Sequence, residues 1–140
     1  MNYALSPKRL RALFRKNGSL RFEPGKKLRT LCRDVPHNLG VYLIRSGKTL
    51  LYIGKAGGIR QDGQRTKQGL YRRLNGKHGG LPTQKWFLQN MQRAGRKAID
   101  IEWFVTYDGK KRTLPVAVES SLIQWFFLQK RTLPDWHRAC

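Results

Sequence analysis

The stretch from residue 40 to residue 55, GVYLIRSGKTLLYIGK, restricts the fold more than any other part of the chain. Two short apolar runs flank the polar residues 46–48, and this pattern predicts two antiparallel strands joined by a tight turn. If the next residue on each side closes the turn, Tyr42 lies directly opposite Tyr52 and the two phenols share one face. Because tyrosine favours strands in general, the pair alone does not establish a site.

The charge of the chain limits its partners. The sequence holds 29 Lys and Arg against 8 Asp and Glu, a net charge of +21. A compact domain with that charge repels itself unless a polyanion or counterions cover it, so nucleic acid is the expected partner. An anionic membrane surface is the alternative, but no stretch has the pattern of a membrane-surface helix or of an apolar span. We therefore expect no membrane partner.

Cysteine usage excludes two further classes. There are two cysteines and no CxxC pair, so neither a disulfide framework nor a four-ligand zinc module is expected. This count suits a reducing compartment, and we expect a cytoplasmic protein.

The other elements follow from apolar periodicity and from Gly and Pro positions. We expect helices over residues 6–17, 69–77, 83–94 and 114–129, and a half-buried strand over residues 98–107. Together with the hairpin they predict an α+β fold, a small antiparallel sheet flanked by helices. Asp100 and Glu102 share one face of the expected strand; they could hold a metal, but a solvated face is the simpler interpretation.

The N-terminal third is strongly basic. Between Lys8 and Arg33 there are ten Lys or Arg and one acid, which favours phosphate contact over a merely solvated face. The loop over residues 56–68 is also basic and rich in glycine. From these segments and the helix after the loop, the candidate nucleic-acid-binding residues are Lys8, Arg9, Arg11, Arg15, Lys16, Arg60, Arg65, Lys67, Arg72, Lys77 and His78.

Glu119 stands out in the most apolar helix. We expect the buried stripe of that helix to be Val116, Leu122, Ile123, Phe126 and Phe127. Glu119 falls within this stripe, where a carboxylate is costly unless it is paired or binds a cation. A buried ion pair, a glutamate near the edge of the stripe and a metal ligand are all open interpretations.

The hairpin motif also carries a family resemblance. G-V-Y, nine residues, and then Y-I-G-K-A resembles the signature of the GIY-YIG nuclease family, and the resemblance extends over residues 40–137. It implies a basic N-terminal helix and arm over residues 1–35 and a nuclease-like domain over residues 36–140. By the same resemblance Lys55, Arg73 in L-Y-R-R-L and Glu119 in V-E-S-S-L-I are site residues; Arg72 is the alternative to Arg73. His137 in P-D-W-H stands where many members have an asparagine.

The resemblance implies an endonuclease that hydrolyses DNA, or RNA or branched nucleic acid, leaving 5′-phosphate and 3′-hydroxyl ends. Glu119 would bind Mg²⁺ or Mn²⁺, and Arg73 would grip the non-bridging oxygens. Tyr42 would act on the attacking water and Tyr52 would contact the phosphate, although the two roles are exchangeable. Nearby cations are expected to lower the phenol pKa into a useful range. The alternative function is a catalytically inactive DNA- or RNA-binding module, which the His137 replacement and the long loop after Lys55 favour.

Overall fold

The computed structural model describes residues 4–78 and 80–137. In chain order the elements are α1 (Pro7–Leu13), β1 (Asn17–Phe22), α2 (Leu28–Leu31), β2 (Leu39–Ser46), β3 (Thr49–Ala56), α3 (Leu70–Asn75), β4 (Lys77–His78), β5 (Leu81–Pro82), α4 (Thr83–Ala94), β6 (Ile99–Tyr107) and α5 (Pro115–Lys130). The fold is α+β, as the sequence predicted, and its main sheet is antiparallel.

The main sheet has the strand order β1-β6-β2-β3, so β3 is an edge strand and β6 is central. All three pairings are antiparallel. β1 lies in the basic N-terminal third of the chain, and it pairs with β6 along its whole length. Residues 17–22, which the sequence analysis placed in the N-terminal arm, therefore belong to the same sheet as the hairpin.

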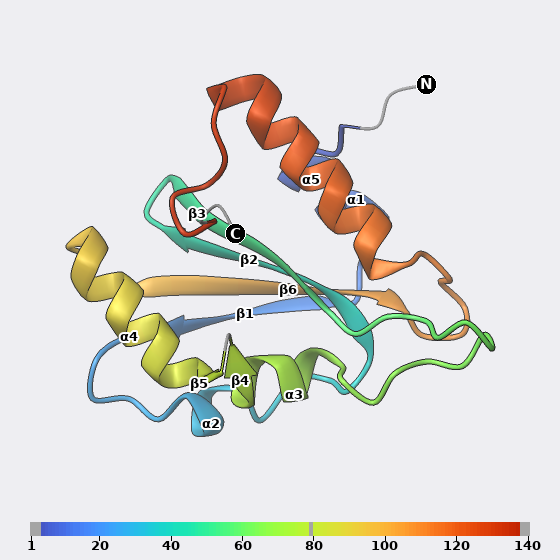
Figure 1. The fold of residues 1–140 in the computed structure, drawn as a ribbon, viewed down its shortest axis with the longest axis horizontal. Coiled ribbons are helices and arrows are strands. Elements are labelled where there is room, and N and C mark those ends of the chain that lie inside the picture. Colours follow the sequence, from blue (N-terminus) through green and yellow to red (C-terminus); the bar gives the residue numbers. More distant parts are fainter. Residues whose placement is uncertain (1–3, 79, 138–140) are drawn as a thin grey trace.

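Helices cover both faces of the sheet, as Figure 1 shows. On one face α1 and α5 enclose a core of Leu10, Phe14, Val41, Leu43, Leu50, Ile53, Phe104, Val118, Leu122 and Phe126. On the other face α2, α3 and α4 enclose a larger core that includes Phe22, Leu28, Tyr42, Ile44, Leu70, Leu74, Phe87, Met91, Ile99 and Ile101. The central strand β6 contributes to both cores, so it is more deeply buried than a half-buried strand.

The register of the hairpin differs from the expected one. Ser46 pairs with Thr49 across a two-residue turn, and a bulge then shifts the register between Ile44 and Arg45. Tyr42 consequently lies opposite Gly54, and Tyr52 lies opposite Ile44. Without the bulge the two phenols would face opposite sides of the sheet, because side chains alternate along a strand. The prediction of a shared face is confirmed and that of direct opposition is wrong.

Helix α1 is shorter than expected. Ser6 is the N-cap, and its hydroxyl accepts a hydrogen bond from Arg9 N at 3.2 Å. The helix ends at Leu13, which is 42% exposed, and only Leu10 and Phe14 reach the core. These two are four residues apart and so lie one above the other on the face toward the sheet.

Helix α4 has the predicted bounds, Thr83–Ala94, and Gly95 ends it in the left-handed conformation. Thr83 is its first residue, and the Thr83 hydroxyl donates to the Arg73 carbonyl at 3.1 Å. This bond ties α4 to α3, the helix that carries Arg73.

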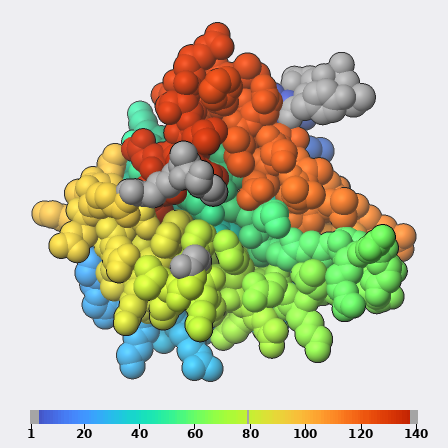
Figure 2. Space-filling model, in the orientation of Figure 1, coloured from blue at the N-terminus to red at the C-terminus, as the bar shows by residue number. Residues whose placement is uncertain are grey.

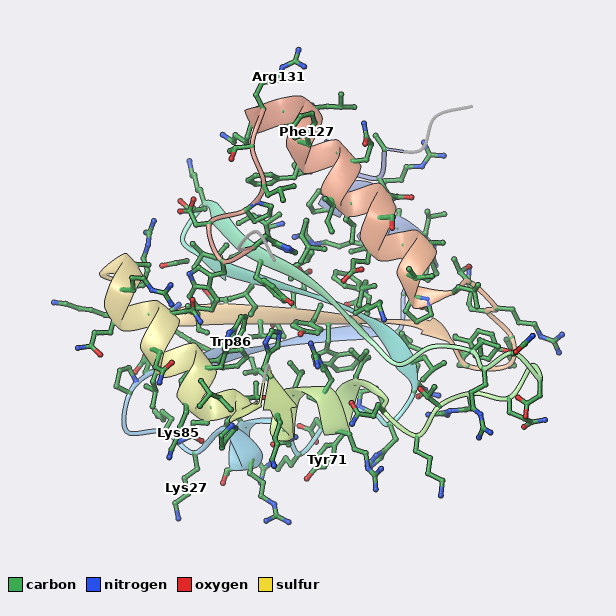
Figure 3. All side chains as sticks on the ribbon, viewed as in Figure 1. Lys27, Tyr71, Lys85, Trp86, Phe127 and Arg131 are labelled. Carbon is green, nitrogen blue, oxygen red and sulfur yellow. The ribbon has the colours of Figure 1, made fainter. Side chains whose placement is uncertain are left out.

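The buried row of α5 also differs from the prediction. Val118, Leu122 and Phe126 face the sheet, at a spacing of four residues. Val116 is 49% exposed and Phe127, near the outer end of α5 in Figure 3, is 42% exposed. Glu119 follows Val118 and is rotated by about 100° from the row, since a helix turns once in 3.6 residues. It therefore lies at the margin of the buried face.

Candidate active site

A hollow of about 400 Å³ lies beside the edge strand β3. Its lining residues are Tyr52, Lys55, Gly57, Gly58, Thr66, Gln68, Arg73 and Glu119. Figure 2 shows the teal surface of β3 between the orange surface of α5 and the yellow-green surface of the α3 to α4 segment. The hollow thus takes side chains from a strand, a loop and two helices that are far apart in sequence.

The edge position of β3 is what brings these side chains together. Tyr52 packs against the core beneath α3 and α4. Lys55 pairs with Val41, whose side chain belongs to the core beneath α5. Paired residues share a face, so Lys55 points to the α5 face of the sheet and Tyr52 points to the other face. Groups on opposite faces of a central strand would be separated by neighbouring strands. At an edge they meet around the free side of the strand, where Arg73 and Glu119 also lie.

Gly54 lets the two tyrosines pack over the strand. Their ring centroids are 6.0 Å apart, and Tyr42 is 1% exposed. A Cβ at Gly54 would overlap Tyr42 Cζ and lie 2.6 Å from Tyr42 Oη and 2.7 Å from Tyr52 Cε2. Any side chain at this position would displace at least one phenol. The glycine of the Y-I-G motif is therefore required by packing.

Arg73 connects the two phenols electrostatically. Burial by itself lowers the pKa of Arg73, but Tyr42 and Tyr52 raise it above its ordinary value. Its Nε is buried and has no hydrogen-bond partner among the described residues. A charged donor left without an acceptor costs free energy, so this guanidinium is suited to receive an anion.

The phenol pKa values move in the direction opposite to the expected one. Burial raises the pKa of Tyr42, the neighbouring Tyr52 raises it further, and Arg73 offsets only part of this shift. Burial likewise raises the pKa of Tyr52, against the influence of Arg73. The expectation that nearby cations lower these pKa values is wrong for the described protein groups, because desolvation dominates. Of the two phenols, Tyr52 lines the hollow and Tyr42 lies beneath it.

Glu119 is a half-buried carboxylate without a close partner. Burial raises its pKa, while Lys55 and Arg73 oppose that shift. Among the described residues no hydrogen bond or ion pair to its carboxylate is found, so the buried ion pair left open by the sequence is not formed. A carboxylate in this environment favours a cation as its neighbour.

The donor set suits a hard divalent cation rather than a closed metal site. In the part of the chain that the structure describes, no group of three or more His, Cys, Asp or Glu could hold a metal. Mg²⁺ is commonly bound by one or two carboxylates together with waters and substrate phosphate. The unpaired carboxylate of Glu119, beside the hydroxyl of Thr66 and the amide of Gln68, fits that mode.

Two histidines hold Tyr52 from different sides. Tyr52 Oη lies 3.0 Å from His78 Nε2, and the ring of His137 stacks on Tyr52 at 4.4 Å and 19°. His137 Nε2 accepts a hydrogen bond from Ile53 N at 2.9 Å, which puts its own proton on Nδ1. Burial lowers the pKa of both histidines, and Arg73 and His137 help to bring that of His78 to about 4.

Sequence reasoning missed Trp86 as a site residue. Its ring stacks on His78 at 3.7 Å and meets Tyr52 edge-on at 5.1 Å; in Figure 3 it lies between α4 and the sheet. A tryptophan beside an apolar helix stripe gives no sign of such a role in the sequence. The structure also places His78, a candidate nucleic-acid-binding residue, against Tyr52.

The other candidate nucleic-acid-binding residues are all exposed: Lys8, Arg9, Arg11, Arg15, Lys16, Arg60, Arg65, Lys67, Arg72 and Lys77. Some have partners within the protein. Arg11 binds Glu102 through two hydrogen bonds of 2.6 and 2.8 Å, and Arg65 donates to the His37 carbonyl at 2.6 Å. Asp100 pairs with Arg21 at 3.2 Å, so the acids of β6 hold arginines, not a metal.

These cations are not gathered around one site. The loop that carries Arg60, Arg65 and Lys67 borders the hollow through Thr66 and Gln68. Arg9 of α1 instead faces a separate hollow with Ala117 and Ser121, on the side of α5 about 200° away from Glu119. The basic N-terminal segment and the candidate active site therefore occupy different surfaces.

No family model, curated protein or solved structure matches this chain, so the comparisons assign it to no family. Among the described residues, no helix combines the length and the apolar character needed to cross a membrane.

Proposed function

We propose that this protein is a metal-dependent endonuclease of the GIY-YIG type, which hydrolyses DNA phosphodiester bonds to leave 5′-phosphate and 3′-hydroxyl ends. One observation carries the proposal: a phenol, an ammonium, a guanidinium and an unpaired carboxylate converge on one hollow. These are Tyr52, Lys55, Arg73 and Glu119, four of the six residues to which the family resemblance assigns a role.

The convergent groups match what phosphodiester hydrolysis requires. The reaction needs a proton acceptor for the attacking water and positive charge around the phosphate, where negative charge develops in the transition state. Arg73 supplies a planar fork for the non-bridging oxygens, and its unpartnered Nε leaves it free to do so. Lys55 adds a second cation on the other side of β3. Glu119 would hold Mg²⁺ or Mn²⁺, which supplies Lewis-acid stabilisation of the phosphate when bound.

Tyr52 accepts the proton of the attacking water, and Tyr42 supports Tyr52 from beneath the hollow. Tyr52 lines the hollow and lies next to His78. With the His78 proton on Nδ1, Tyr52 can receive a proton from water while its own phenolic proton passes to His78 Nε2. This route needs no free phenolate. The negative charge of a bound phosphodiester raises the pKa of His78 and so favours the transfer.

DNA is the proposed substrate, and the net charge of +21 supports a polyanionic one. RNA and branched nucleic acids present the same backbone and belong in the substrate panel. A cytoplasmic location stays a prediction from cysteine usage.

A catalytically inactive nucleic-acid-binding module is the second candidate. The raised pKa values of both tyrosines favour it, because neither phenol is ionised near neutral pH in the described protein. Such a module would bind DNA in a salt-sensitive way and need no metal.

A plasmid-nicking assay separates the two. Wild type, Glu119→Gln and Glu23→Gln are each incubated with Mg²⁺, with Mn²⁺ and with EDTA. Glu23→Gln removes the same charge from an acid whose partner is Arg21, away from the hollow. We expect metal-dependent nicking by wild type and Glu23→Gln but not by Glu119→Gln. Plasmid binding without nicking in either metal would contradict the nuclease and favour the inactive module.

The choice of phenol has its own test. Tyr52→Phe keeps the ring and removes the hydroxyl that contacts His78, so we expect it to lose more nicking activity than Tyr42→Phe. The reverse order would show that Tyr42 acts on the water.

A further inference from the structure

A second hollow, of about 300 Å³, lies at the other end of the contact between α5 and β3. It is formed by the turn between β2 and β3 and by the last turns of α5. Its lining residues are Arg45, Lys48, Thr49, Leu50, Trp125, Phe126, Gln129 and Lys130. Three of these are cations and none is an acid.

Arg45 is the unusual member of this group. It is half-buried, and its Nε is buried without a hydrogen-bond partner among the described residues. Glu102, the acid that most affects Arg45, is already held by Arg11 through both carboxylate oxygens. Burial and the charge of Arg11 both lower the pKa of Arg45, which shows that its positive charge is poorly compensated.

The same feature marks the candidate active site. Among the described residues, Arg45 and Arg73 are the two arginines whose Nε is buried and unpaired. Each borders a hollow, and each has lysines nearby: Lys55 beside Arg73, and Lys48 and Lys130 beside Arg45. A buried donor on a charged group is costly to leave unpaired, so both hollows favour an anion that can accept from it.

We propose that Arg45, Lys48 and Lys130 bind a backbone phosphate of the same nucleic acid whose scissile bond lies at Arg73, and that Trp125 contacts the adjoining sugar or base. The identity of the ligand rests on the proposed function. Trp125 is half-buried and lines the hollow, and aromatic side chains are common contacts for nucleotides beside a basic groove.

The spacing of the two hollows suits contacts to a single bound duplex. At 1.5 Å per residue, the part of α5 between Glu119 and Lys130 is about 16 Å long. Successive base pairs rise about 3.4 Å, so a duplex that passes the first hollow reaches the second after about five base pairs. The second hollow therefore contacts a flank of the substrate, about half a helical turn from the cut.

Binding of DNA is measured in EDTA, so that metal-dependent cleavage does not take place during the titration. A labelled DNA duplex of about two helical turns is titrated by fluorescence anisotropy over a range of salt concentrations. The variant is Lys48→Gln with Lys130→Gln, and the control is Lys27→Gln with Lys85→Gln. All four lysines are exposed, and in Figure 3 Lys27 and Lys85 lie at the edge of the molecule opposite the end of α5 marked by Arg131.

Each lost phosphate contact reduces the slope of log K against log salt by about 0.9. We expect the Lys48 and Lys130 variant to lose up to about 1.8 from this slope and the control to lose much less. Equal changes in the two variants would show that only net charge matters and would overturn the proposal. So would an unchanged slope in the Lys48 and Lys130 variant.

Arg45→Gln and Trp125→Phe are the second pair of variants, each checked for folding by circular dichroism. Both should weaken duplex binding. Competition with deoxyadenosine monophosphate identifies the source of the phosphate. The contrary result is that the mononucleotide quenches Trp125 fluorescence only when Arg45 is present, while all these variants bind the duplex as tightly as wild type does. In that case the occupant is a free nucleotide and the backbone assignment is wrong.

The outcome is separable from that of the nuclease. Nicking that depends on Glu119, together with a slope equal to that of the control, would keep the proposed function and reject the second phosphate site. A reduced slope without any nicking would keep the phosphate site and reject catalysis.

Discussion

Replacing Gly54 by alanine tests the packing of the two tyrosines with the smallest change that the chain allows. The new Cβ would lie 2.6 Å from Tyr42 Oη and 2.7 Å from Tyr52 Cε2, whereas ordinary contacts of this kind begin near 3.4 Å. Unless the backbone shifts, Tyr42 must therefore move its hydroxyl by about 0.8 Å and Tyr52 must move its ring by about 0.7 Å. Tyr42 is 1% exposed, so the surrounding core must yield as well.

The displacement has a cost in stability and a larger one in activity. Overpacking a well-packed core costs about 1–3 kcal/mol. At about 4 °C per kcal/mol for a chain of this size, the melting temperature should fall by about 4–12 °C. A reacting group misplaced by about 1 Å can lose roughly 100-fold in rate, so nicking should fall by a similar factor.

Gly58→Ala is the matched control for stability. Gly58 belongs to the same hollow, but a Cβ there would meet nothing within 4 Å, and its backbone is not in the left-handed region. Thermal unfolding of the two variants is compared by circular dichroism, and nicking of Gly54→Ala is compared with that of wild type. The packing argument fails if Gly54→Ala has the same melting temperature as Gly58→Ala, or if Gly54→Ala nicks DNA as fast as wild type. Tyr42→Leu in the Gly54→Ala background should recover part of the lost stability, since it removes one side of the overlap.

Three further predictions follow from the charges and pKa shifts. The pKa of His78 is lowered in the folded state, so its contribution to stability should be lost as pH falls from about 6.5 toward 4. In denaturant titrations, His78→Gln should reduce this dependence of the unfolding free energy on pH. The same pH dependence in the variant and in wild type would contradict the buried, neutral imidazole. Arg11→Ala breaks a partly exposed ion pair and should lower the free energy of unfolding by about 0.5–1 kcal/mol, whereas Arg15→Ala should not. In salt-dependent DNA binding the order should reverse, because Arg15 forms no ion pair with any described residue; a larger slope change for Arg11→Ala would refute this.

Local patterns in the sequence determined much of the architecture. The bounds of α4 and the placement of both tyrosines on one face were predicted and are confirmed. These features depend on capping groups, on glycine positions and on the alternation of side chains along a strand, all of which act within a few residues. The excess of cations likewise predicts a polyanionic partner without any knowledge of the fold, and this stays a prediction.

Contacts between distant segments decided the rest. The bulge that sets Tyr42 opposite Gly54, and the pairing of β1 with β6, depend on how strands meet in the sheet. Whether Glu119 and Arg73 lie at one site depends on β3 being an edge strand, because only there can groups from both faces of the sheet meet.

The sign of the phenol pKa shifts was also a matter of tertiary structure. The sequence shows that cations are numerous, but the burial of Tyr42 and Tyr52 outweighs them. Desolvation depends on everything that surrounds a side chain, and no local pattern encodes it. The sequence by itself determined which residue types are available for chemistry, and the packing of the sheet edge decided which of them meet and in which protonation state.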